Sequence, residues 1–139
     1  MEYNFYGWQT ADAASVNDEF PFSSPRELYD KLSDVWCEYT CCPRLRDKWT
    51  KENKTLGQCS ITAFLAQEIF GGLVLGIATE SGVHCFNVVG GVAFDLTSEQ
   101  FSRRLSYENA VEQSRDRHFG SKEKYERYLY LKKKLKETL

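Results

Sequence analysis

Apolar positions recur at helical spacing soon after a polar, aromatic N-terminal stretch. Ser24 and Pro25 form a typical helix start, and Glu27 stands three residues after the cap. The predicted helix ends before the Cys-Cys-Pro run at residues 41–43, because a residue that precedes proline is pushed toward extended backbone. Its expected inward face holds Leu28, Leu32, Val35, Trp36 and Tyr39.

Further helices are predicted later in the chain. A polar, turn-prone connector at residues 43–58 leads into a helix over residues 59–70, which Gly71-Gly72 ends. A mixed helical segment is expected over about residues 107–117. The last predicted helix covers about residues 122–138 and carries Tyr128, Leu131 and Leu135 on one side.

Between these helices the hydrophobic period changes to that of strands. Residues 73–79, 83–89 and 92–97 are short, β-branched and aromatic segments, separated by Glu-Ser-Gly and by Gly90-Gly91. A two-residue Gly-Gly connection is a strong hairpin signal. The pattern predicts an α+β fold in which a three-stranded antiparallel meander packs against the helix at 59–70, with further helices at both ends of the chain.

Composition fits one folded domain preceded by an extension. The chain has 139 residues, 42% of them hydrophobic and 14% aromatic, which argues against disorder. We expect an N-terminal extension over residues 1–23 and a single α+β domain over residues 24–139. The early aromatic residues are expected to pack onto the domain, and a partner-binding segment is the alternative; they are Tyr3, Phe5, Tyr6 and Trp8.

Charge and cysteine content narrow the function classes. The net charge of −2 indicates no general attraction to nucleic acid or to anionic membranes. The start of the chain lacks the pattern of a signal peptide, and the longest apolar stretch is too short to span a bilayer, so a cytoplasmic location is expected. No nucleotide-binding motif predicts a cofactor. The cysteines at 37, 41 and 42 lack a second ligand pair, so no metal site is predicted.

Cys59 is the strongest candidate for chemistry because it opens a predicted helix, where unpaired backbone N–H groups favour an anion. A two-residue turn at Gly90-Gly91 places His84 opposite Thr97 and makes Asp95 its diagonal neighbour on the same face. That spacing allows a carboxylate–imidazole hydrogen bond. If the helix covers this face, the thiol can meet the imidazole.

A purely structural interpretation of these residues stays open. Cys59 and Cys85 can be small buried residues, His84 a satisfied polar residue, and Asp95 the end of a strand. Cys85 follows His84 directly, so strand alternation places it on the opposite face and makes it a poor partner for the same site. His118 stands alone in the sequence and is expected at the surface.

Several short motifs stand between residues 49 and 101: Trp49 to Asn53, Gly57 to Cys59, Gly71-Gly72, His84 with Asn87, and Asp95 with Thr97, Gln100 and Phe101. With these motifs the sequence resembles the YunG-like family of small, uncharacterised bacterial proteins. More distantly, its cysteine helix, histidine strand and aspartate strand resemble the core of transglutaminase-like and papain-like thiol enzymes, although the histidine strand lacks the aromatic run of many transglutaminase-like domains. This second resemblance implies a Cys–His–Asp site.

These observations predict acyl-group chemistry on a peptide, amide, ester or thioester. Cys59 would attack the carbonyl, His84 would transfer protons, and Asp95 would orient the imidazole. The Cys59 backbone N–H with the side chain of Gln58 or Asn53 is expected to hold the oxyanion, and Trp49 is expected to wall the cleft.

Two other functions remain open at this point. One is a non-catalytic binding or regulatory module that keeps the three residues as a buried polar network. The other is a redox-sensing thiol at Cys59, for which Cys41 and Cys42 are the nearest resolving candidates in sequence.

Overall fold

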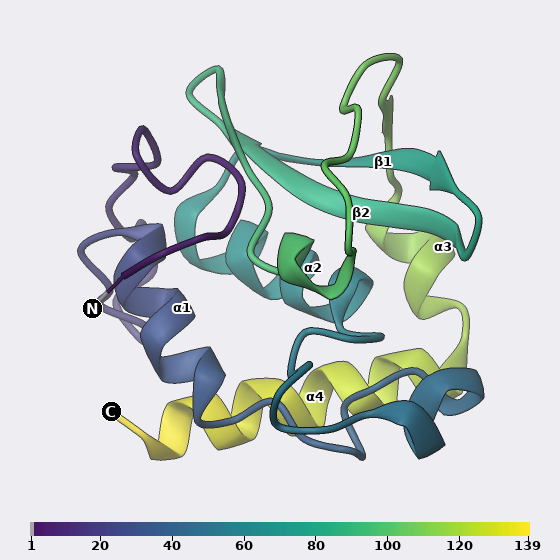
Figure 1. Ribbon diagram of the computed structural model, residues 1–139. Helices are drawn as coiled ribbons and strands as arrows, with labels where there is room; N and C mark the ends of the chain where they lie inside the picture. Colours follow the sequence, from purple (N-terminus) through teal and green to yellow (C-terminus); the bar gives the residue numbers. More distant parts are fainter. Residues whose placement is uncertain (1) are drawn as a thin grey trace.

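The computed structural model describes residues 2–139 and shows a mixed α+β fold (Figure 1). Two short 3-10 helical turns, η1 and η2, accompany the helices and strands. In chain order the elements are α1 (Pro25–Ser33), η1 (Pro43–Lys48), α2 (Cys59–Phe70), β1 (Leu73–Thr79), β2 (Gly82–Val89), β3 (Val92–Phe94), η2 (Ser98–Gln100), β4 (Val111–Glu112), α3 (Arg115–Phe119) and α4 (Lys122–Glu137).

The sheet is antiparallel, with the strand order β3-β2-β1-β4. Gly90 and Gly91 join β2 to β3 with φ angles of 58° and 79°, the left-handed backbone that a tight hairpin turn requires. Val89 therefore lies opposite Val92, which confirms the predicted register.

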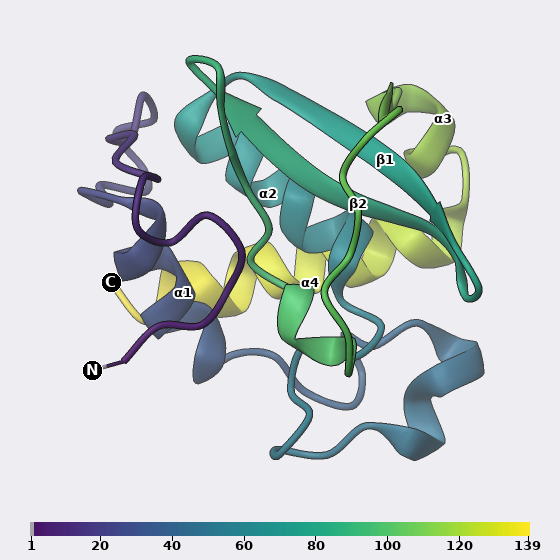
Figure 2. The same cartoon turned by 45° about the horizontal axis from the view of Figure 1, so that its top comes forward.

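Helix α2 lies between the sheet and α4 (Figures 1 and 2). On the sheet side, the Asn87 side-chain amide donates a 2.9 Å hydrogen bond to the Ala63 carbonyl of α2. On another side, the Trp36 indole N–H donates to the Thr62 hydroxyl at 2.9 Å. Both bonds are buried, so they fix how α2, and with it Cys59, sits against the rest of the fold.

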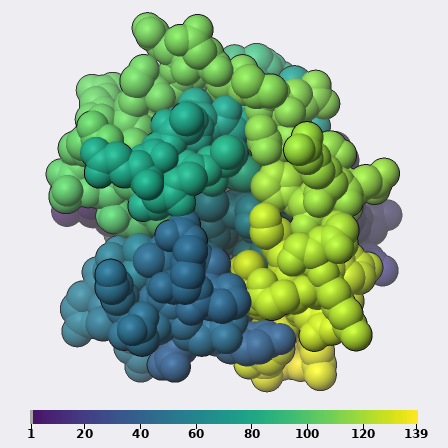
Figure 3. Space-filling view, turned by 90° about the vertical axis from the view of Figure 1, so that its right-hand side faces the viewer, coloured from purple at the N-terminus to yellow at the C-terminus, as the bar shows by residue number. Residues whose placement is uncertain are grey.

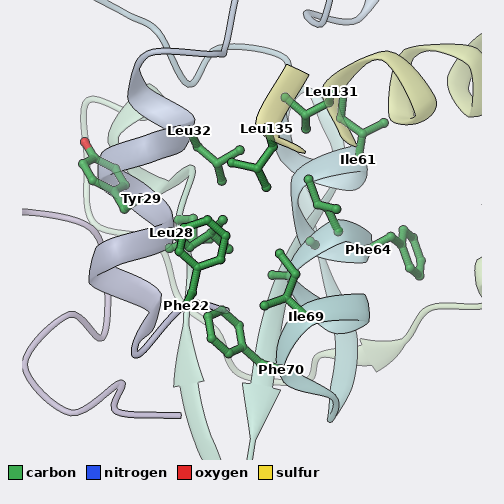
Figure 4. Close-up of a cluster of buried hydrophobic side chains, with 14 of the residues drawn as sticks. Phe22, Leu28, Tyr29, Leu32, Ile61, Phe64, Ile69, Phe70, Leu131 and Leu135 are labelled. Atoms are coloured by element: carbon green, nitrogen blue, oxygen red, sulfur yellow. The ribbon is translucent and has the colours of Figure 1, made fainter. Parts of the chain in front are cut away.

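The hydrophobic core forms around α2, because this helix is apolar on nearly all sides. Figure 4 shows Leu28 and Leu32 of α1 packing toward Leu135 of α4 and the apolar residues of α2. The main buried side chains of α2 are Ile61, Phe64, Leu65, Ile69 and Phe70.

The segment before α1 is part of this core. Phe5, Phe20 and Phe22 are almost fully buried in the same cluster as α2. Tyr6 pairs with Asp95 through an isolated antiparallel bridge, in which the Asp95 N–H donates to the Tyr6 carbonyl at 2.9 Å. The expectation that the early aromatic residues pack onto the domain is confirmed.

The sheet differs from the predicted meander at both of its edges. A fourth strand, β4, pairs with β1 where helix was expected, and α3 is confined to residues 115–119. Strand β3 ends at Phe94 instead of residue 97, because Asp95 directs its backbone to Tyr6 and its carboxylate to Thr97. Both differences arise from contacts between distant segments, which local periodicity does not report.

Helix α1 is shorter than predicted. It begins at Pro25 with the Ser24 hydroxyl accepting from the Glu27 N–H, as expected, but it ends at Ser33. Tyr39 lies beyond this end and is 42% exposed, so its predicted inward position was wrong. No helix within residues 2–139 is both long and apolar enough to cross a membrane.

Candidate active site

Cys59 is the first residue of α2, where backbone N–H groups lack helical acceptors. The chain enters this helix through Gly57, whose φ of 71° is left-handed. A Cβ at Gly57 would lie 2.5 Å from the Cys41 sulfur and 3.0 Å from the Cys42 backbone nitrogen. Glycine is therefore required for the close approach that sets Cys59, itself partly exposed, at the mouth of a pocket.

His84 and Asp95 form a buried hydrogen-bonded pair. The His84 Nε2 atom lies 2.6 Å from Asp95 Oδ2, and both side chains are almost inaccessible to solvent. Asp95 accepts three further hydrogen bonds: from the Thr97 N–H at 3.2 Å, from the Thr97 hydroxyl at 3.3 Å, and from the Tyr107 hydroxyl at 2.7 Å. The carboxylate is thus held in one orientation, and it holds the imidazole in turn.

The imidazole favours its charged form. Burial alone lowers the pKa of His84, but the hydrogen bonds to Asp95 and Cys59 outweigh burial and raise this pKa to about 10. Because Asp95 accepts from Nε2, the other ring nitrogen, Nδ1, is the one left to face Cys59. His84 is therefore an imidazolium at neutral pH.

The thiol favours its ionised form. Hydrogen bonding from the Cys85 thiol contributes most to lowering the pKa of Cys59, burial opposes it, and His84 lowers it further. The result is a pKa well below that of an ordinary cysteine. The two pKa shifts together favour a thiolate at Cys59 and an imidazolium at His84.

Cys85 belongs to this site, contrary to the expectation from strand alternation. Hydrogen bonding between the two thiols lowers the pKa of Cys59 and raises the pKa of Cys85, and the Cys85 backbone lowers the pKa of Cys59 further. Strand β3 pairs only with Asn87–Val89, so β2 has no β3 partner beside Cys85. The start of α2 approaches β2 there, and two successive residues of the strand can reach the same sulfur.

A pocket of about 410 Å³ opens at Cys59 and His84. Figure 3 shows the hollow between the connector before α2, the β1–β2 hairpin and the start of α4. Its remaining lining residues are Cys42, Pro43, Arg44, Leu45, Gly57, Ser60, Thr79, Ser81, Val83, Gln100, Phe101, Glu123, Lys124 and Arg127. Cys59, which is partly exposed, and His84 therefore share the lining of one pocket.

The model of the family described as YunG protein matches residues 24–139. The chain belongs to the YunG family. It is 38% identical over 72 residues to the Uncharacterized protein YunG of Bacillus subtilis (strain 168), a match that covers 52% of this chain and 62% of that relative. No solved structure matches the chain. The distant resemblance to papain-like and transglutaminase-like enzymes is not supported by these comparisons.

The structure does not bring the other predicted residues of this YunG-family chain into the pocket lining. Gln58 is buried, and its amide donates to the Cys37 carbonyl at 3.2 Å. The Trp49 indole donates to the Lys54 carbonyl at 2.9 Å, and Asn53 lies in a neighbouring turn. None of the three predicted residues lines the pocket with Cys59 and His84.

Other pocket residues were not predicted. The Gln100 side chain accepts from the Gly57 N–H at 3.4 Å and donates to the Thr97 carbonyl at 3.0 Å. Gln100 could have been found, because it belongs to the YunG-like motif. Lys124 and Arg127 reach the pocket from α4, and no local pattern links this helix to Cys59.

Metal ligands are not assembled at this site. Across residues 2–139, no group of three or more His, Cys, Asp or Glu side chains is arranged to hold a metal ion. All five cysteines are free thiols in the structure.

Proposed function

We propose that this protein is a thiol enzyme that performs acyl-group chemistry on an amide, ester or thioester. The observation that carries the proposal is that Cys59, at the start of α2, and His84 line one pocket, where the pKa shifts of both groups favour a thiolate beside an imidazolium. Asp95 positions the imidazole through the 2.6 Å hydrogen bond. The proposal includes a papain-like or transglutaminase-like core, since the nucleophile stands at a helix start beside a histidine strand.

The reaction begins when the Cys59 thiolate attacks the carbonyl carbon of the substrate. The resulting tetrahedral intermediate collapses as the His84 imidazolium gives its proton to the leaving amine, alcohol or thiol, which leaves a thioester on Cys59. Water, or a second nucleophile in a transfer reaction, then attacks the thioester while His84 takes its proton. Release of the acyl product restores the thiolate and the imidazolium.

The developing oxyanion needs hydrogen-bond donors that are already in place. The Cys59 backbone N–H is one, because it opens α2 and has no helical acceptor. Gln100 lines the pocket with Cys59, so its side-chain amide is better placed as the second donor than the buried Gln58.

Reaction with p-nitrophenyl acetate, a small activated ester, tests this function. We expect a burst of p-nitrophenol and an acetyl group on Cys59, located by peptide mass spectrometry. Cys59→Ala should abolish the burst, whereas Cys42→Ala, which removes another thiol of the same pocket, should retain it. An acetyl group spread evenly over the cysteines, or a burst that survives Cys59→Ala, would overturn the proposal.

A second candidate function is a redox-responsive thiol pair. Cys42 lines the same pocket as Cys59, and hydrogen bonding from Cys41 lowers its pKa to about 6. Hydrogen peroxide would oxidise the Cys59 thiolate to a sulfenic acid with release of water, and the Cys42 thiol would then form a disulfide and release a second water. A Cys42–Cys59 linked peptide after mild peroxide, without any acyl transfer, would favour this function.

The non-catalytic alternative makes a different prediction. A binding or regulatory module would keep the Cys59–His84–Asp95 network for its structure alone. Cys59 would then accept no acetyl group from the ester, even though the hydrogen bonds around it are intact.

A further inference from the structure

The pocket beside Cys59 has an excess of positive charge. Its lining holds the cations Arg44, Lys124 and Arg127 but one carboxylate, that of Glu123. Glu123 is already paired, since it accepts from Arg127 Nε at 2.5 Å and lies 3.8 Å from Arg46. The carboxylate therefore does not neutralise the other cations of the pocket.

Lys124 is held in place without being neutralised. Its ammonium group donates to His118 Nδ1 at 3.0 Å, and the other His118 nitrogen lies 3.0 Å from the Gln113 side-chain oxygen. Burial and the nearby lysine lower the pKa of His118, so this histidine stays a neutral acceptor. Within residues 2–139, no carboxylate lies within 4.0 Å of Lys124.

His118 thus has a role that its isolated position in the sequence did not suggest. It was expected at the surface, but it is partly buried against Phe64 and sets the direction of the Lys124 ammonium. A neutral acceptor orients the cation while leaving its charge available to a ligand.

Arg44 adds a second cation from the opposite wall. Its guanidinium donates to the Ser81 carbonyl in the β1–β2 hairpin, and it too has no carboxylate partner among the described residues. Its charge is partly offset, because Arg44 helps lower the pKa of the neighbouring Cys42 thiol. Lys124 is therefore the stronger of the two anion-binding groups.

The helices around the pocket add to its positive electrostatic potential. Helix α2 begins at Cys59 and α4 begins at Lys122, so both present their positive ends on this side of the molecule. The pocket volume of about 410 Å³ is in the range of small-molecule sites. A small anion would therefore gain both electrostatic attraction and burial next to the thiolate.

We propose that the substrate is a small acyl compound that carries a carboxylate close to the bond that is cleaved, and that Lys124, with Arg44, binds this carboxylate. The inference rests on the proposed thiol function and adds its substrate class. Lys124 acts here as a specificity residue, because its charge discriminates between anionic and neutral compounds that have the same reacting group.

Alkylation of Cys59 by iodoacetate and by iodoacetamide tests the inference. Both reagents transfer an alkyl group to sulfur with loss of iodide, and they differ in that iodoacetate is an anion. The rate of each reagent at Cys59 is measured by peptide mass spectrometry, and the iodoacetate-to-iodoacetamide ratio reports the charge of the pocket. We expect Lys124→Met to lower this ratio about threefold to tenfold, and Arg44→Gln to lower it less.

Lys122→Met is the matched control, since Lys122 lies on the same helix with its side chain 90% exposed and outside the pocket lining. This control should leave the ratio unchanged, and Lys124→Arg should largely preserve it. An unchanged ratio in Lys124→Met would overturn the carboxylate proposal even where iodoacetamide still selects Cys59. Loss of that selectivity in the unaltered protein would instead overturn the thiol function itself.

Discussion

The Cys59 sulfur is surrounded by groups that favour its anion by different physical routes. The Cys85 thiol and backbone N–H donate hydrogen bonds, His84 supplies a positive charge, and the start of α2 supplies unpaired N–H groups. Burial opposes ionisation, but these contributions outweigh it. Each of them can be removed separately by substitution, except those of the backbone.

The pH dependence of stability tests the ion pair. Between about pH 6.5 and 8.5, Cys59 of the unfolded chain is protonated and His84 is neutral. In the folded protein over the same range, the Cys59 thiol is ionised and His84 is protonated. Each state then binds one proton, so the pair adds no pH dependence there. In Cys59→Ser the contribution of the thiol is lost, and Asp95 remains as the group that raises the pKa of His84 against burial. The stabilisation from that raised pKa is complete below pH 6.5 and is lost as pH rises through the folded pKa.

Urea unfolding at pH 6, 7.5 and 9 measures this difference. The free energy of unfolding of Cys59→Ser should fall with rising pH more steeply than that of the unaltered protein, by at most about 1.4 kcal/mol per pH unit. The double variant Cys59→Ser/His84→Ala is the control and should lose the extra slope. Parallel curves for Cys59→Ser and the unaltered protein would show that the pair does not exist.

Substitution of Asp95 should lower the pKa of His84. Asp95→Asn removes the buried carboxylate that, with Cys59, raises this pKa to about 10, so burial of the imidazole would act with less opposition. NMR titration of the His84 ring protons measures the shift. Tyr107→Phe is a milder comparison, because it removes one hydrogen bond to Asp95 and leaves the charge. A titration of His84 that is the same in Asp95→Asn would rule out this role.

The contact between His84 and Asp95 could be predicted because it depends on one local feature. The two-residue turn at Gly90-Gly91 fixes the register, and the register fixes which side chains are diagonal neighbours. The contact of Cys85 with Cys59 could not be predicted from alternation. It depends on where β3 ends and on how the start of α2 approaches β2, both of which are properties of the assembled fold.

Among the elements, the turn that leads into α2 has a strict backbone requirement. Gly57 needs a left-handed φ and also has no room for a Cβ beside Cys41. Gly91 has a left-handed φ of 79° but open space around it. A comparison of alanine substitutions at the two glycines therefore distinguishes the effect of backbone strain from that of steric contact.

Gly57→Ala should destabilise the protein more than Gly91→Ala. Gly91→Ala adds backbone strain alone, about 1 kcal/mol, whereas Gly57→Ala adds the same strain and a contact 2.5 Å from the Cys41 sulfur. Urea unfolding gives both values, and Cys41→Gly in the Gly57→Ala background should recover part of the difference. An equal loss of stability in Gly57→Ala and Gly91→Ala would mean that the connector before α2 adjusts to the added Cβ without further loss of stability.

The bounds of the central helix and strand can be predicted from local sequence, whereas those of the peripheral elements cannot. Helix α2 and strand β1 have the predicted bounds, since apolar spacing, Gly71 and the Gly-Gly turn all act within a few residues. Strand β4 has two residues, which are too few to show the alternating hydrophobic pattern of a strand, and it pairs with the edge of β1. The sequence pattern therefore does not predict it. Helix α1 ends at Ser33, and beyond it the Val35 and Trp36 N–H groups both donate to the Leu32 carbonyl.

At the scale of the whole molecule, the N-terminal segment belongs to the folded unit although it precedes the part that the family match covers. Phe5 is fully buried, and Tyr6 bonds the backbone of Asp95 and stacks on Tyr107. The segment therefore supports the same carboxylate that orients His84. The aromatic content of this segment predicted that its side chains would be buried, but the sequence did not indicate which face of the domain the segment covers.

Phe5→Ala should destabilise the protein by about 3–5 kcal/mol, because it leaves a cavity in the core. Val16→Ala, at a position of the same segment that is 74% exposed, is the control and should change stability little. Thermal unfolding monitored by circular dichroism measures both. Similar small effects would mean that the segment is not part of the cooperative core.

The pocket is also a property of the whole molecule. Its walls come from the connector, the start of α2, the β1–β2 hairpin, η2 and the first turns of α4. Arg127 ties α4 to the turn before η1, since its guanidinium donates to the Thr40 carbonyl at 3.0 Å. The cations beside Cys59 are brought there by this packing, which explains why sequence spacing did not reveal them.

The pH profile of Cys59 alkylation by iodoacetamide tests the thiolate–imidazolium pair most directly. An ordinary thiol has a pKa of about 8.5 and reacts roughly tenfold more slowly for each pH unit below it. We predict that Cys59 keeps most of its pH 8 rate at pH 6, and that His84→Ala slows it at pH 6 by tenfold or more. A Cys59 profile that falls tenfold per unit from pH 8 to pH 6, unaffected by His84→Ala, would contradict the account.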